Sequence, residues 1–258
     1  MEKNAPIGVF DSGVGGISVL RELVKIMPNE DYLYLGDSIH APYGTKSLEE
    51  VRSLTIDNIK KLLEQNAKSI VVACNTATSA AVAVLRQMYP ELPIVGIEPA
   101  IKPAALDAPG SRVVVMATPM TLRQEKFQKL LGRYKDQAEI VSLPCPGLME
   151  FVERGELKSE ALEKYLTELL WTVSDKQIDS IVLGCTHYPF VEKMIKKVAG
   201  ENVKIFYGGY GTAKEMQRRL KEAELLTERT EKGKVQFLNS RDTEEERKLC
   251  EFLLHTEL

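Results

Sequence analysis

The sequence contains no uninterrupted apolar run of the length, about 20 residues, that a membrane-spanning helix needs. Its net charge is only −3 and no basic stripe occurs, so it lacks the electrostatic surface that binds nucleic acid. The opening segment MEKNAPIGVF does not have the layout of a secretory signal peptide, because a strand-like run begins at once. We therefore expect a cytoplasmic protein whose partners include neither nucleic acid nor a membrane.

Cysteine and histidine are scarce, and their spacing argues against metal binding. The cysteines at 74, 145, 185 and 250 form no CxxC pair, and the chain has only three histidines. A cytoplasmic location also argues against disulfides. The glycine spacing in SGVGG (12–16) matches neither a dinucleotide fingerprint nor a P-loop. We therefore expect no metal and no cofactor.

Short runs rich in Val and Ile alternate with helical patterns along the whole chain. Such runs do not alternate apolar with polar residues, so they indicate strands covered on both faces, as in a parallel α/β sheet. A capping box at Ser47–Glu50 predicts the start of a helix, and Asp242 predicts the start of the last one. The predicted strands are 7–10, 32–35, 70–73, 94–96, 113–117, 139–143, 181–184, 203–206 and 234–238.

One strand pattern occurs twice. SIVVACNTAT (69–78) and SIVLGCTHYP (180–189) both place a cysteine directly after a buried strand, and IGVFDSG (7–13) has a similar counterpart in VVVMATP (113–119). We therefore predict an α/β fold of two similar, doubly wound domains with mainly parallel sheets, related by a pseudo-two-fold. The predicted domains are 1–97 plus 208–258 and 98–207. The active site is expected at their interface.

Polar residues follow several of the predicted strands, where open parallel sheets bind their ligands. A cysteine beside a strand is usually a small buried hydrophobe. However, a helix start follows both Cys74 and Cys185, and a helix N-terminus lowers the pKa of a thiol. The pair therefore favours a function for both, on opposite sides of one cleft, whereas Cys145 and Cys250 are interpreted as structural.

Other strand-end residues each have a structural and a functional interpretation. Asp11 caps a helix or, facing a thiol, accepts a proton. His187 is a core histidine or exchanges protons near neutral pH. Tyr43 and Gly44 form an ordinary turn or hold a carboxylate with their N–H groups. Glu153, from position alone, is an exposed helix residue.

Four motifs, in order, resemble the glutamate racemases of the aspartate/glutamate racemase superfamily: FDSGVGG, GDxxxxPYG, ACNTAT and GCTHYP. The resemblance extends from about residue 6 to 222. It implies that Cys74 and Cys185 are the acid and base and that Asp11, His187 and Glu153 assist them. It also implies a set of substrate-binding residues: Asp11, Ser12, Tyr43, Gly44, Asn75, Thr76, Thr186 and His187. One departure is Tyr207-Gly208-Gly209, where many relatives have Asp-Ser-Gly.

The resemblance implies cofactor-independent interconversion of L- and D-glutamate, with D-glutamate supplied to peptidoglycan synthesis. Glutamate is then the small-molecule partner; a homodimer is a further expectation. Two alternatives stay open. One is an aspartate racemase, although PYG and FDSGVGG favour glutamate. The other is a non-catalytic amino-acid-binding α/β protein, in which the cysteines only fill the core.

Overall fold

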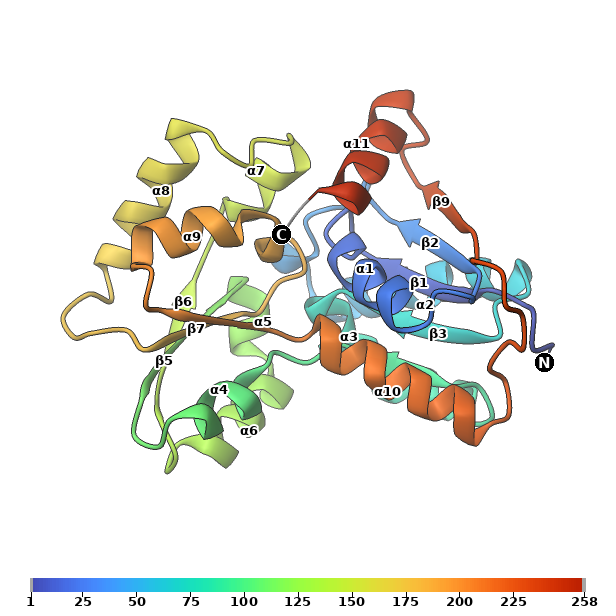
Figure 1. Cartoon of the computed structure of the whole chain (residues 1–258), viewed down its shortest axis with the longest axis horizontal. Helices are drawn as coiled ribbons and strands as arrows, with labels where there is room; N and C mark the ends of the chain where they lie inside the picture. The colour runs from blue at the N-terminus through green and yellow to red at the C-terminus, as the bar shows by residue number, and fades with distance from the viewer. Residues whose placement is uncertain (1, 257–258) are drawn as a thin grey trace. The chain divides into compact units, whose positions relative to one another are not determined.

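The computed structural model describes residues 2–256 and divides the chain into two compact units. Unit 1 comprises Met1–Glu98 and Gly209–His255, so the blue and the red parts of the chain in Figure 1 belong together. Unit 2 is the intervening stretch Pro99–Gly208. Each unit has one sheet of parallel strands with helices around it, which confirms the predicted α/β fold class. That the units are the predicted domains, 1–97 with 208–258 and 98–207, stays a prediction.

The sheet of unit 1 has the strand order β4-β3-β1-β2-β9, and every neighbouring pair is parallel. The central strand β1 is buried along its whole length, as its unbroken apolar run predicts. The last strand of the chain lies at one edge, where Asn239 is opposite Gly36. The strands are β1 (Ile7–Asp11), β2 (Tyr32–Gly36), β3 (Ser69–Val72), β4 (Ile94–Gly96) and β9 (Val235–Asn239).

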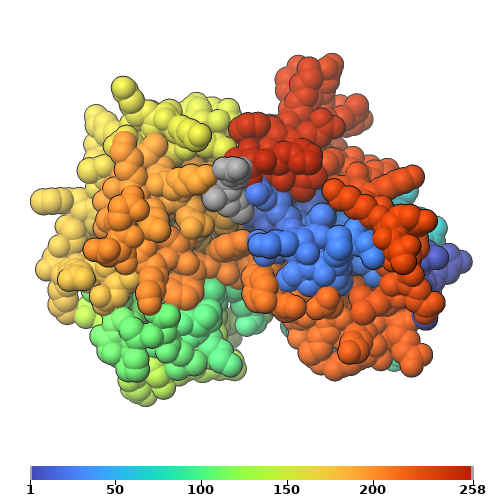
Figure 2. All heavy atoms as spheres, viewed as in Figure 1, coloured from blue at the N-terminus to red at the C-terminus, as the bar shows by residue number. Residues whose placement is uncertain are grey.

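The helices of unit 1 form two groups, because α2 packs against α3 whereas α1 packs against α10 and α11. The C-terminal residues, red in Figure 2, lie against the blue N-terminal part of this unit. Ser47 caps α2 by accepting a hydrogen bond from the Glu50 N–H, as predicted. The elements are α1 (Ile17–Ile26), η1 (Tyr43–Thr45), α2 (Leu48–Glu64), α3 (Asn75–Met88), α10 (Gly209–Glu222) and α11 (Glu244–His255).

The predicted start of the last helix at Asp242 is wrong. Asp242 lies in a turn with φ at +44°, and α11 begins at Glu244. The hydroxyl of Thr243 instead accepts a hydrogen bond from the Glu246 N–H at 3.2 Å. Thr243 therefore satisfies one of the backbone donors that the first turn of a helix leaves unpaired.

Unit 2 has the strand order β6-β5-β7-β8, again parallel throughout. The two central strands β5 and β7 are fully buried. Its strands are β5 (Arg112–Ala117), β6 (Glu139–Pro144), β7 (Ser180–Leu183) and β8 (Lys204–Tyr207). Its helices are α4 (Ile101–Asp107), α5 (Pro119–Arg123), α6 (Glu125–Tyr134), α7 (Leu148–Glu153), α8 (Glu160–Trp171), η2 (Tyr188–Val191) and α9 (Glu192–Ala199).

All of the strand-like runs predicted from the sequence form strands in these two sheets. Within residues 2–256, none of the helices combines the length and the apolar character needed to cross a membrane.

A buried ion pair ties distant parts of unit 1 together. The Lys68 ammonium lies 2.6 Å from a carboxylate oxygen of Glu30, and neither side chain is more than 2% exposed. The other Glu30 oxygen accepts a hydrogen bond from the N–H of Thr227, in the segment that returns from α10 to β9. Lys68 also donates to the carbonyl of Lys3. Charge burial of this kind is tolerated only while every partner is present.

We expect Glu30→Ala to lower the free energy of unfolding by about 3–5 kcal/mol, because the Lys68 charge would stay buried without its counter-charge. Asp57→Ala is the matched control, since Asp57 forms an exposed pair with Lys60. That pair is expected to contribute less than about 1 kcal/mol. Urea denaturation followed by circular dichroism measures both changes. Equal losses in the two variants would contradict a structural role for the buried pair.

Candidate functional site

The carboxyl edge of the unit 1 sheet gathers polar residues that lie at or just after the ends of its strands. Asp11 ends β1, Asp37 follows β2 and Cys74 follows β3. Since β1 lies between β2 and β3 and all three are parallel, these side chains leave the sheet at one edge. All three are at least 94% buried. Three other predicted site residues are buried beside Asp11 and Cys74 in the sequence: Ser12, Asn75 and Thr76.

Cys74 is the N-cap of α3. Its sulfur accepts a hydrogen bond from the Ala77 N–H at 3.4 Å and another from the Ser12 hydroxyl at 3.5 Å. Both donors and the positive end of the helix stabilise negative charge on the sulfur. Asn75 opens the helix, and its side-chain oxygen Oδ1 is buried with no hydrogen-bond partner among the described residues. The first turn of α3 therefore offers a thiol, helix N–H groups and an unused acceptor.

Asp11 is held in a tight turn. Its Oδ1 accepts a hydrogen bond from the Gly13 N–H at 3.0 Å. A Cβ at Gly16 would lie 2.5 Å from the Cβ of Asp11, so only glycine leaves room for this carboxylate. The first helix has Gly16 at its N-cap and no side-chain cap, so Asp11 does not serve as that cap. The helix-cap interpretation of Asp11 is therefore wrong.

Asp37 is a central member of this edge that the sequence analysis did not assign. Its buried carboxylate accepts hydrogen bonds from the Tyr43 hydroxyl at 2.7 Å and from the Asn58 amide at 3.1 Å, and the His40 imidazole lies at 2.9 Å. Burial raises the pKa of Asp37, but the hydrogen bonds from His40, Tyr43 and Ser240 outweigh it and lower the pKa. Asp37 is therefore ionised and holds the loop that carries Tyr43.

The side chain of Tyr43 points into the protein, where its hydroxyl donates to Asp37. It is 1% exposed, and burial and the adjacent Asp37 raise its pKa, with a further contribution from Cys74. The Tyr43 hydroxyl is therefore a neutral donor to Asp37. Tyr43 and Gly44 begin η1, where backbone N–H groups have no acceptor within the helix. These N–H groups, not the phenol, are what this loop can offer to an anion.

In unit 2 a thiol, an imidazole and a carboxylate form a chain of contacts. Cys185 follows β7 after Gly184, where a Cβ would lie 2.8 Å from the Met116 carbonyl oxygen. The sulfur of Cys185 lies 3.6 Å from His187 Nδ1, and His187 Nε2 lies 2.7 Å from Glu153 Oε1. Glu153 ends α7 with its side chain only 15% exposed. The interpretation of Glu153 as an exposed helix residue is therefore wrong.

The imidazole of this chain is fully buried yet favours its charged form. Burial alone would lower the pKa of His187, but hydrogen bonds and charges from Cys185 and Glu153 raise it well above its usual value. By contrast, burial raises the pKa of the Cys145 thiol, which donates to the Leu143 carbonyl at 3.3 Å. Cys145 therefore stays a neutral thiol. Thr186, also predicted to bind substrate, is buried between Cys185 and His187 in the sequence.

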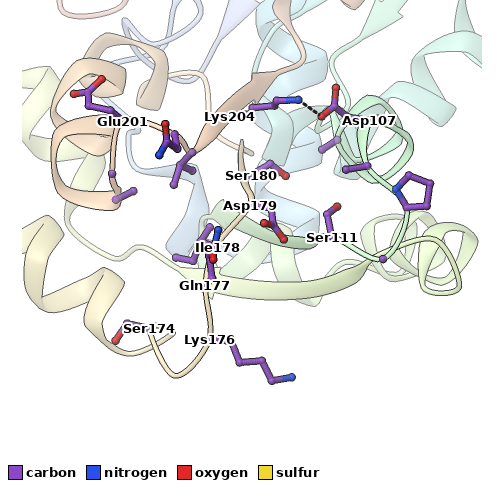
Figure 3. A pocket seen from close by; sticks show the side chains of 18 residues that line it. Asp107, Ser111, Ser174, Lys176, Gln177, Ile178, Asp179, Ser180, Glu201 and Lys204 are labelled. Carbon is purple, nitrogen blue, oxygen red and sulfur yellow. Dashed lines mark hydrogen bonds and ion pairs between the residues drawn. The ribbon is translucent and has the colours of Figure 1, made fainter.

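A pocket of about 810 Å³ in unit 2 lies away from these residues. Figure 3 shows Ser111, Ser180 and Lys204 in its lining, and these residues are at the starting ends of the strands, opposite the thiol edge. Two charged residues of the lining pair with each other, because the Lys204 ammonium lies 2.7 Å from a carboxylate oxygen of Asp107. None of the predicted site residues lines this pocket.

The sequence of the chain matches one known protein family over a region that includes both thiol sites. The sequence model of the family described as Asp/Glu/Hydantoin racemase matches residues 7–208, which include Cys74 and Cys185. The chain belongs to the Asp/Glu/hydantoin racemase family. The family match stops before β9 and α11, which complete unit 1.

Individual members of the Asp/Glu/hydantoin racemase family resemble the chain over nearly its whole length. The glutamate racemase of Clostridium novyi is 52% identical over 241 residues, 93% of each chain. That of Clostridium botulinum is 48% identical over 255 residues, 99% of each chain. The crystal structure of glutamate racemase from Francisella tularensis in complex with D-glutamate has a TM-score of 0.85 at 30% identity. It covers 99% of this chain and 96% of its own.

A second solved member is the Escherichia coli glutamate racemase, in complex with L-glutamate and the activator UDP-MurNAc-ala. It has a TM-score of 0.81 at 27% identity and covers 94% of this chain and 92% of its own. The similarity to these relatives extends over both units of the chain and therefore includes both thiol sites.

The raised pKa of His187 gives a pH-dependent prediction. A group whose pKa is higher in the folded than in the unfolded state stabilises the fold below its unfolded pKa of about 6.5, and this contribution is lost as the pH rises through the folded value. We expect Glu153→Gln to lower the pKa of His187 by about one unit or more, since it removes a negative charge from the imidazole. NMR titration of the ring proton measures the change.

The control for this titration is Glu150→Gln, one turn earlier on α7. Glu150 makes no hydrogen bond to His187 in the described part of the chain, so this variant is expected to leave the pKa of His187 within about 0.3 units. An unchanged pKa in Glu153→Gln would show that the carboxylate does not support the imidazolium.

Proposed function

We propose that the chain is a cofactor-independent glutamate racemase that uses two cysteines. The observation that carries the proposal is that each sheet has a thiol at its carboxyl edge, with its own charge-stabilising partners. Inversion at a carbon centre requires a proton to leave from one face and another to arrive at the opposite face, so two proton-transfer groups are needed. The names of the relatives, glutamate racemases at about half identity, support glutamate as the substrate.

The proposed reaction begins with one sulfur as a thiolate and the other as a thiol. The thiolate takes the α-proton of glutamate, and the thiol donates its proton to the opposite face of the resulting carbanion. One C–H bond breaks and one forms, and the two sulfurs end with exchanged protonation states. The opposite enantiomer uses the opposite starting state, so Cys74 and Cys185 exchange the roles of acid and base. No electron sink is needed in this scheme, and the absence of a cofactor stays a prediction.

The carbanion needs donors fixed around the carboxylate before the proton leaves. The first turn of α3, with Asn75 and Thr76, supplies helix N–H groups of the kind that bind anions. The unpartnered Asn75 Oδ1 is suited to accept a hydrogen bond from the substrate ammonium. We assign the N–H groups of Tyr43 and Gly44 to the second carboxylate. Thr186, beside Cys185, is the counterpart of Asn75-Thr76 in unit 2.

The assisting groups differ between the two thiols. His187, charged and held by Glu153, stabilises a thiolate on Cys185. On the other side, Ser12 donates directly to the Cys74 sulfur, and the buried carboxylate of Asp11 is proposed to accept or relay a proton near it. Racemisation from the two enantiomers is therefore expected to depend unequally on Asp11 and His187.

The biological role proposed for the product is the supply of D-glutamate to peptidoglycan synthesis. The support is that the E. coli relative was crystallised with an activator, UDP-MurNAc-ala, that carries the sugar acid of that polymer. A cytoplasmic location and a homodimer stay predictions from the sequence. Aspartate racemisation and amino-acid binding without catalysis are outcomes that the following experiment separates.

We expect the purified protein to racemise L- and D-glutamate with no added cofactor and to leave aspartate largely unchanged. In D₂O the product is expected to carry deuterium at the α-carbon, because the delivered proton comes from an exchangeable thiol. Polarimetry and mass spectrometry follow the two signals. Binding of glutamate without loss of optical activity would instead support a binding protein.

Replacing either Cys74 or Cys185 with Ala is expected to lower kcat for racemisation by about 10³-fold or more, since inversion needs both thiols. Each variant keeps one base and is expected to eliminate chloride from 3-chloroglutamate of one α-configuration, with the two variants acting on opposite configurations. Cys250→Ala is the control and is expected to keep kcat within about threefold. Full activity in one of the two variants would remove that cysteine from the mechanism.

A further inference from the structure

The loop that follows β2 is fixed on two sides. We define the site loop as residues 37–45, which include Tyr43 and Gly44. On its inner side the Asp37 carboxylate holds Tyr43 and Asn58, as described above. The next residue, Ser38, is fully buried and points to a different partner: its hydroxyl donates to Glu246 Oε1 at 2.5 Å. Consecutive residues of the loop therefore connect to two different parts of unit 1.

Glu246 lies on α11, far along the chain from the site loop. Its carboxylate accepts hydrogen bonds from Ser38 and, at 3.1 Å, from the Asn239 amide, which also donates to the Ser38 hydroxyl at 2.9 Å. Only 7% of Glu246 is exposed. These three side chains form a closed cluster in which Ser38 and Glu246 are buried and Asn239 is half-buried. A buried carboxylate is stable only with such donors.

The local sequence suggests a different use for this carboxylate. Thr243 and Glu246 have the spacing of a capping box, in which the glutamate accepts a hydrogen bond from the backbone N–H of the capping residue. The Thr243 half of the box forms, at 3.2 Å from the Glu246 N–H. In the described structure, however, the hydrogen bonds of the Glu246 carboxylate go to Ser38 and Asn239, outside its own helix.

A second contact joins the same two segments. The Ile39 N–H of the site loop donates to the Ser240 hydroxyl at 2.9 Å, and the Ser240 N–H donates to the Gly36 carbonyl at 2.9 Å. Figure 1 shows β9 beside β2, with α11 directly following β9. The C-terminal segment thus holds both the side chain and the backbone of the site loop where it leaves the sheet.

We propose that Glu246 is a positioning residue for the proposed substrate site. Through Ser38 it fixes the site loop, and so the N–H groups of Tyr43 and Gly44 that are assigned to a substrate carboxylate. This inference rests on the proposed function and extends it, because α11 lies beyond residues 7–208, where the family match ends. It makes the C-terminal segment of this chain part of substrate binding without direct contact between Glu246 and the substrate.

The first test measures the loop itself and needs no substrate. Amide hydrogen exchange is compared in the full-length protein for Glu246→Ala and for Glu245→Ala, the exposed neighbour on the same helix. Glu246→Ala leaves the buried Ser38 hydroxyl without its acceptor and removes one of the two acceptors of the Asn239 amide, so exchange in residues 37–45 is expected to become about tenfold faster or more. Glu246→Gln keeps an acceptor oxygen. The exchange rates of Glu245→Ala and Glu246→Gln in residues 37–45 are therefore expected to stay close to those of the wild-type protein.

The second test measures glutamate racemisation with the same variants. Loss of loop positioning weakens substrate binding, so the KM of Glu246→Ala is expected to rise about tenfold while kcat stays within about threefold. The KM of Glu246→Gln is expected to stay close to that of the wild-type protein. Ser38→Ala removes the other end of the hydrogen bond and is expected to reproduce the rise. The double variant Ser38→Ala, Glu246→Ala is then expected to add little to either single change.

The outcomes separate this proposal from the proposed function. Unchanged exchange in the site loop of Glu246→Ala overturns the positioning role, and so does faster exchange spread evenly over unit 1. Faster exchange in the loop with an unchanged KM overturns the link to substrate binding. If the unchanged protein fails to racemise glutamate, the proposed function fails, while the exchange measurement still decides whether Glu246 holds the loop.

Discussion

Every strand in both sheets runs parallel to its neighbours, and the placement of the chemical groups depends on this constraint. Parallel strands bring their carboxyl ends, and the starts of the helices that follow, to the same edge of a sheet. A residue just after such a strand therefore lies at that edge, and Cys74, as the N-cap of α3, also lies close to helix N–H groups. Cys74 and Cys185 occupy this position in separate sheets. Their partners differ: a backbone N–H and a hydroxyl for Cys74, an imidazole supported by a carboxylate for Cys185.

Most of the framework could be predicted from the sequence, because the responsible signals are local. Unbroken Val and Ile runs indicate buried parallel strands, and all of the predicted runs form strands. The two cysteines were recognisable because each directly follows such a run. The capping box at Ser47 also acts within four consecutive residues, and the predicted start of α2 is confirmed.

The remaining parts of the site depend on contacts between elements that are distant in the sequence. The bond between Glu153 and His187 requires α7 to be oriented against the end of β7, which no local pattern specifies. Asn58 is a polar residue on the buried side of α2, which weakly indicates a special role. Its partner Asp37 lies on another element, so the sequence alone does not reveal their bond. At Glu246 the spacing to Thr243 is typical of a capping box, but the carboxylate instead accepts a hydrogen bond from Ser38, which is distant in the sequence.

The strand order of unit 1 also has a consequence for how the protein is made. The central strand β1 is translated first, whereas β9, which covers the outer edge of β2, lies near the other end of the chain. A ribosome therefore releases all of Pro99–Gly208 before the first sheet can be completed. During that interval the edge of β2 has no partner, and an open strand edge can pair with the wrong chain. A translation product that stops before residue 235 would contain the whole of the second sheet and a first sheet open to aggregation.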